Sequence, residues 1–150
     1  LFIARVFAAM AASPRHTFQV LTKRPARMAS DAEDYLKPWP PNVWAGATIE
    51  GDAWSGRADD LRKIPAKVRF LSLEPLLGPL PSLDLSGIHW VIVGGETGPR
   101  ARSMSAAWVA DVRDRCAAAR IPFFFKRWGG RDLDRGSHYL DGRLWQEFPS

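Results

Sequence analysis

Charged side chains follow each of the apolar segments that the sequence predicts to be β-strands. They are Lys23, Arg24, Glu50, Glu74, Glu96 and Lys126. Carboxylates accept hydrogen bonds from hydroxyl and amine groups, whereas ammonium and guanidinium groups bind anions. If the strand ends meet, this set predicts a binding site for a polar or anionic ligand, with neighbouring cations keeping the carboxylates ionised.

Residue alternation within the strands supports such a site. Residues two apart share a face of a strand, and three series of small or polar residues lead to a carboxylate. These series are Gly46, Thr48 and Glu50; Ser72 and Glu74; and Gly94 and Glu96. This pattern is typical of a wall that faces a cavity. The alternative is that the strands simply become polar as they leave the core.

Helical and extended patterns alternate along the chain. The predicted strands are 16–24, 42–50, 67–75, 89–96 and 121–128, and the predicted helices are 2–12, 25–36, 51–64 and 105–119. Short apolar strands separated by helices indicate parallel βα units. We therefore expect an α/β fold, a partial and incomplete TIM-type barrel of about five parallel strands with flanking helices. Ligands bind at the carboxyl ends of such strands.

The chain of 150 residues is predicted to be a single domain over 1–150. Its tail, 129–150, contains Asp141 and Gly142 between two alternating segments, a typical turn signal. We expect the tail to form a hairpin that caps the sheet.

The glycines of VIVGGETGPRAR, residues 91–102, raise a separate question. Gly94 and Gly95 do not belong to a P-loop, because no Gly-Lys-Ser/Thr follows, and their spacing is not that of the dinucleotide fingerprint. They allow either a tight turn or the close approach of a bound group. The sequence leaves both alternatives open.

Aromatic and metal-ligating residues add little further chemistry. Trp54 and Trp108 lie on apolar helical stripes and are expected in the core, whereas Trp128, beside Lys126, is a candidate to stack on a base. Cys116 is the single cysteine, which excludes an internal disulfide. It also lies on an apolar helical stripe and is expected in the core. The three histidines lack ligand-like spacing, so no metal site is predicted in this chain.

The overall charge favours an anionic partner without identifying one. The chain has 21 Lys and Arg against 16 Asp and Glu, a net charge of +5. Such a charge suits a nucleic acid or nucleotide ligand, but the arginines are scattered, as on an ordinary solvated surface. No apolar run reaches the length of a membrane span, so no membrane partner is expected and we predict a cytoplasmic protein.

Five motifs, in this order, resemble a phage and prophage protein family of unknown function. They are TFQVLTKRPARM, PPNVWAGATIE, VRFLSLEPLLGPL, WVIVGGETGPRAR and IPFFFKRWGG. Members of that family look like radical S-adenosylmethionine proteins, distantly similar to spore photoproduct lyase, with a partial or full TIM-type barrel. The resemblance implies that this chain matches the C-terminal, substrate-side part of such a barrel.

The same resemblance implies a preceding segment with three clustered cysteines, which would hold an iron–sulfur cluster and S-adenosylmethionine in the full-length family. This chain begins at Leu1 and contains no such cluster of cysteines. We therefore expect no redox activity from the chain alone, and whether the natural protein is an enzyme stays open. Gly94, Gly95 and Glu96 have the same letters as a motif with which radical S-adenosylmethionine enzymes hold the methionine amino group. That motif lies on an early strand, whereas these residues lie on the fourth predicted strand, so the role is not transferred.

Two other functions remain as alternatives. The chain could be a nucleic-acid-binding phage module without catalytic activity, or an inactive remnant. If strands are missing before the one at Thr17–Thr22, that strand has an open edge, which a homodimer or the C-terminal hairpin would have to cover.

Overall fold

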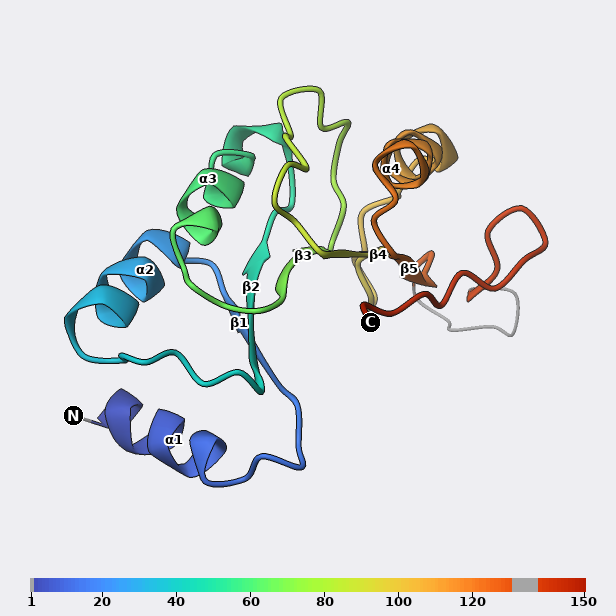
Figure 1. The fold of residues 1–150 in the computed structure, drawn as a ribbon. Coiled ribbons are helices and arrows are strands. Elements are labelled where there is room, and N and C mark those ends of the chain that lie inside the picture. Colours follow the sequence, from blue (N-terminus) through green and yellow to red (C-terminus); the bar gives the residue numbers. More distant parts are fainter. Residues whose placement is uncertain (1, 131–137) are drawn as a thin grey trace.

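The computed structural model describes residues 2–130 and 138–150 (Figure 1). Its strands are β1 (Phe18–Thr22), β2 (Val43–Thr48), β3 (Arg69–Leu73), β4 (Trp90–Gly94) and β5 (Phe123–Arg127). Its helices are α1 (Phe2–Ala11), α2 (Pro25–Asp34), α3 (Arg57–Arg62) and α4 (Ala106–Ala119), with a short 3-10 turn, η1 (Asp52–Trp54).

The strands form one five-stranded sheet in the order β1-β2-β3-β4-β5, and every neighbouring pair is parallel. Figure 1 shows the helices following one another around one side of this sheet. The α/β class and the parallel pairing predicted from the sequence are therefore confirmed.

Local signals explain where the helices begin and end. Pro25 occupies the first turn of α2, where its missing N–H is not needed. Ser105 caps α4 by accepting a hydrogen bond from the Ala107 amide at 3.3 Å, and Arg120 ends the helix in a left-handed conformation.

The single helix predicted over 51–64 is wrong. The segment instead forms η1 and then the short α3, with Ser55 and Gly56 between them. Glycine is a poor helix former, so the chain can change direction here. As a result, Trp54 does not lie on the stripe of Ala58 and Leu61 that packs into the core.

The sheet has two different faces. The face toward the helices, the helix face, carries the buried apolar residues Val43, Ala45, Ala47, Leu71, Leu73, Val91, Val93, Phe123 and Phe125. Helix residues such as Met28, Leu61 and Val112 complete this core. Since side chains alternate along a strand, the residues between them point to the opposite face.

An aromatic cluster covers the amino-terminal half of that opposite face. Its members are Trp44, Phe70, Trp90, Phe124 and Phe148. The ring centroid of Trp90 lies 5.8 Å from that of Phe70 and 5.4 Å from that of Phe148. A Cβ at Gly46 would lie 2.3 Å from Phe70 Cζ, so the Phe70 ring packs directly across this glycine.

The C-terminal tail lies along β5. The Phe125 amide donates to the Trp145 carbonyl at 2.8 Å, and the Glu147 amide donates to the Phe123 carbonyl at 3.2 Å. Asp141 and Gly142 adopt positive φ in a tight turn bridged by Leu140 and Arg143, while the predicted hairpin residues 131–137 lie outside the described residues. The described part of the tail, residues 129–130 and 138–150, thus extends the β5 side of the sheet and does not cover the edge of β1.

None of the helices in residues 2–130 and 138–150 is both long enough and apolar enough to cross a bilayer.

Candidate functional site

The carboxyl end of β2 holds an ion-pair cluster built around Glu50. One carboxylate oxygen pairs with Lys23, which follows β1, and the other accepts from Arg57 Nη1 at 2.9 Å. Arg57 Nη1 also donates to the Thr48 carbonyl at 2.7 Å, which anchors the guanidinium to the end of β2. The Glu50 and Arg57 side chains are only 14% and 15% exposed, whereas the Lys23 side chain is 61% exposed.

Glu50 is ionised at neutral pH. Burial by itself would raise its pKa, but the hydrogen bond and charge of Lys23, together with Arg57, hold the pKa of the carboxyl below its ordinary value. The site therefore presents a fixed carboxylate between two cations, and not a general acid of raised pKa.

A second ion pair joins two strands that are not neighbours. Lys126 Nζ on β5 lies 2.9 Å from Glu74 Oε2, which follows β3. The pair passes over Gly94 on the intervening β4, where an added Cβ would lie 3.1 Å from Glu74 Cδ and Oε1. Gly94 therefore leaves the space in which Glu74 reaches toward Lys126.

The two clusters belong to adjacent strands. Thr48 and Ser72 are paired across β2 and β3, and both are buried on the opposite face. Glu50 and Glu74 come two residues later, just beyond the ends of β2 and β3, and so lie at the same carboxyl edge of the sheet. We call Lys23, Glu50, Arg57, Glu74 and Lys126 the rim.

Four predicted site residues thus gather at one edge, and Glu96 has a different partner. Arg102, from the segment before α4, binds Glu96 through two side-chain nitrogens at 2.7 and 2.8 Å and through its amide at 2.9 Å. These hydrogen bonds lower the pKa of Glu96 to about 2. Its carboxylate is therefore engaged by its own loop and not by a rim lysine.

Packing accounts for Gly95 without a bound group. A Cβ at this position would lie 1.7 Å from the Trp128 carbonyl oxygen, and the Gly95 amide donates to the Arg127 carbonyl at 2.9 Å. The chain leaving β4 therefore passes so close to the chain leaving β5 that only glycine fits. The sequence left open a tight turn or the close approach of a bound group. At Gly95 the group that approaches closely is the backbone of the chain leaving β5.

The two remaining predicted site residues lie apart from the ion pairs. Trp128 packs edge-on against the core residue Phe125, with ring centroids 5.0 Å apart, and its Nε1 donates to the Tyr139 carbonyl at 2.8 Å. Arg24 precedes α2 and lines a groove on the α2 side of β1.

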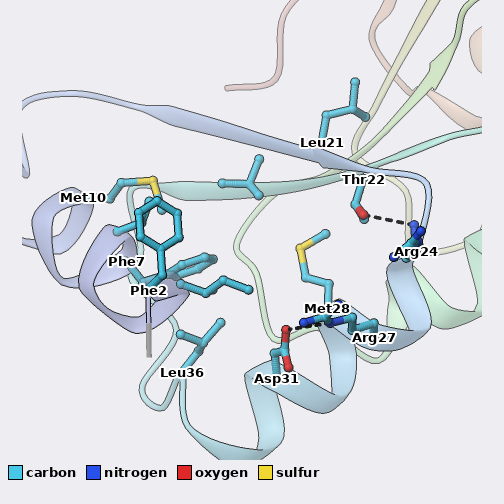
Figure 2. Close-up of a pocket in the computed structure, with 13 residues that line it drawn as sticks. Phe2, Phe7, Met10, Leu21, Thr22, Arg24, Arg27, Met28, Asp31 and Leu36 are labelled. Carbon is cyan, nitrogen blue, oxygen red and sulfur yellow. Dashed lines mark hydrogen bonds and ion pairs between the residues drawn. The ribbon is translucent and has the colours of Figure 1, made fainter.

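That groove, shown in Figure 2, has a volume of about 380 Å³ and is mainly apolar. It lies between α1, β1 and α2, and its lining includes Phe2, Val6, Met10, Leu21 and Met28. The ion pair of Arg27 with Asp31, at 3.8 Å, stands beside it. The groove adjoins the outer edge of β1 and contains no rim residue.

The sequence did not predict one rim residue, Arg57, or the position of its neighbour, Trp54. Arg57 was not considered, and Trp54 was expected in the core, whereas its side chain is 51% exposed. The Arg57 guanidinium carbon lies 4.3 Å from the centroid of the Trp54 ring. The sequence does place an aromatic residue, Trp54, and an arginine, Arg57, shortly after a strand end, and this spacing could have indicated that the two side chains lie together.

The chain does not fit an iron–sulfur cluster. Such a cluster needs several thiolates, and the single cysteine, Cys116, is fully buried in α4, where burial raises the pKa of its thiol to about 12. Over the described residues, no group of three His, Cys, Asp or Glu side chains is arranged to hold a metal ion.

Comparison with known proteins gives a family but no function. No curated protein and no solved structure matches this chain. One family, described as "Protein of unknown function (DUF5131)", matches residues 1–149. Because that match spans nearly the whole chain, the protein belongs to this uncharacterised family.

Proposed function

We propose that this chain supplies the ligand-binding rim of a partial TIM-type barrel, and that the rim binds a small ligand with an anionic group. One observation carries the proposal: two ion pairs, drawn from the ends of four strands, lie at the same carboxyl edge of a parallel sheet whose described helices cover one face. That edge is where parallel α/β folds bind their ligands.

Each rim residue has a role in this proposal. Lys23 and Lys126, whose ammonium groups are more accessible than their partners' carboxylates, bind the anionic group. Glu50 and Glu74 hold the lysines in place and accept hydrogen bonds from ligand hydroxyl or amine groups. Arg57 fixes Glu50.

At a finer level, the motifs support a substrate-side part of a radical S-adenosylmethionine-like barrel in a cytoplasmic phage protein. Any cluster acting with this rim would draw its thiolates from outside residues 1–150, because Cys116 cannot supply them. The chain's own contribution is therefore ligand binding and orientation.

Inorganic phosphate is a suitable first probe. Its binding can be monitored by the backbone amide chemical shifts in an NMR titration. We expect the largest shifts at the ends of β1, β2, β3 and β5. Lys126→Met should weaken binding at least about fivefold, since one charge-assisted contact is lost. Lys63→Met is the matched control, because it removes an exposed lysine at the C-cap of α3 that pairs with Asp60 at 2.7 Å.

Shifts that map to the helices, or equal losses in both lysine variants, would count against the rim. Alanine at Glu50 or Glu74 separates the proposal from an inactive remnant. In an inactive remnant neither substitution would change phosphate binding. If the rim binds the ligand, each substitution changes phosphate binding, because it releases a lysine from its carboxylate partner.

The net charge of +5 favours one second candidate, a nucleic-acid-binding module. It predicts affinity for single-stranded DNA that falls steeply as salt is raised. Affinity that hardly changes between low and moderate salt, or no affinity, would exclude this candidate.

A further inference from the structure

An exposed indole stands next to the rim. Trp54 ends η1, which directly follows the β2 end that carries Glu50. The Arg57 guanidinium covers one face of its ring, with 4.3 Å between the guanidinium carbon and the ring centroid. Trp54 is nevertheless 51% exposed, so a large part of the residue remains open to solvent.

This indole is continuous with the charged groups of the rim. Arg57 contacts both the Trp54 ring and Glu50, and Glu50 in turn pairs with Lys23. Two cations share one ionised carboxylate in this series, so it retains an excess positive charge. The Lys23 side chain is 61% exposed and has room for a second partner.

We propose that Trp54 is a stacking platform for the ring of a purine nucleoside monophosphate whose phosphate is bound by Lys23. The inference rests on the proposed rim and adds the class of ligand. A flat aromatic surface beside a cation complements a flat base linked to an anion.

Guanidinium packing holds the indole in place. Arg57 packs against one face of the ring and donates hydrogen bonds to Glu50 and to the Thr48 carbonyl. Because the indole is already held, it loses less conformational entropy when a ligand stacks on it. One indole beside one exposed ammonium, that of Lys23, matches a single nucleotide unit, which favours a mononucleotide over a nucleic acid strand.

The test compares ligands by isothermal titration calorimetry: AMP, ribose 5-phosphate, inorganic phosphate and a single-stranded thymidine 20-mer. We expect AMP to bind about tenfold more tightly than ribose 5-phosphate, in line with one stacked base. Trp54→Leu should abolish this preference and leave phosphate binding unchanged, whereas Trp54→Phe should retain part of it. Tyr139→Leu, which removes another exposed ring, is the matched control.

The outcomes separate the inference from the proposed function. If Lys126→Met weakens phosphate binding but Trp54→Leu leaves the AMP preference intact, the rim stands and the stacking role is wrong. An equal loss of phosphate and AMP binding in Trp54→Leu would also overturn stacking, because the ring would then act only by positioning Arg57. Binding of the 20-mer without binding of AMP would favour the nucleic-acid candidate, and binding of none of the four would overturn both proposals.

Discussion

The three carboxylates that follow β2, β3 and β4 are held in two different ways. Glu50 and Glu74 are each bound by a lysine from another strand, so their positions depend on the assembled sheet. Glu96 is bound by Arg102, six residues further along its own loop. A ligand can compete for the two lysines without unfolding a loop, whereas displacing Arg102 would release the segment that leads into α4.

The Glu96–Arg102 pair gives a pH dependence of known sign. The pKa of Glu96 is lowered from 4.5 to about 2, so its contribution to stability is fully present above pH 4.5 and is lost as the pH falls toward 2. We expect Glu96→Gln to lower the free energy of unfolding at pH 7, and the difference from wild type to close near pH 2. Urea denaturation at several pH values measures this.

Glu33→Gln is the control for that series, since Glu33 is exposed and has no ion pair in the described part of the chain. A Glu96→Gln deficit that is the same at pH 7 and pH 2 would show that the charge is irrelevant.

At the level of single residues, the sequence predicted the strand faces but not the partners. Alternation correctly placed Gly46 with Thr48 on one face of β2, because the period of a strand is independent of its neighbours, whereas Glu50 and Glu74 lie just beyond the ends of their strands. The ion pair of Glu96 with Arg102 depends on the conformation of the loop between them, so it could not be predicted from the pattern of residue types. Trp54 was misplaced because a helical period was assumed across Gly56.

At the level of elements, the close contact between the ends of β4 and β5 predicts a large effect of a small substitution. In Gly95→Ala, the new methyl group would collide with the Trp128 carbonyl, a backbone atom that cannot swing away. We expect a loss of about 1–3 kcal/mol in the free energy of unfolding, measured by chemical denaturation.

Gly78→Ala is the comparison, because nothing lies within 4 Å of the added Cβ. We expect its effect to stay within about 0.5 kcal/mol. Equal effects of the two substitutions would mean that glycine flexibility, and not the close contact, determines the cost.

The strands were predictable because they are short, mainly apolar runs and their ends carry turn residues. The interruption between η1 and α3 was not, since a glycine inside a helical pattern is often tolerated. The path of the tail along β5 depends on long-range hydrogen bonds, such as that from Trp90 Nε1 to the Glu147 carbonyl at 2.8 Å.

At the level of the whole molecule, the sheet has one unprotected side. The outer edge of β1 has no partner among the described residues, and Leu21, Val6 and Phe2 are exposed beside it. Unpaired strand edges next to apolar side chains promote association. We therefore expect a concentration-dependent homodimer through this edge, detectable by light scattering after size-exclusion chromatography.

Leu21→Lys should shift that equilibrium toward monomer, because it places a charge on the edge strand. Leu144→Lys makes the same change at an exposed leucine of the tail and should have no effect. A wild-type protein that stays monomeric at high concentration would contradict this prediction.

Cys116 has a practical consequence. It is the single thiol in the sequence, it is fully buried in α4, and burial raises its pKa to about 12, so the thiolate that reacts with alkylating reagents is scarce in the folded state. A cysteine introduced at an exposed position would therefore accept a fluorophore or spin label with little background. The native protein is thus already suited to site-specific spectroscopy.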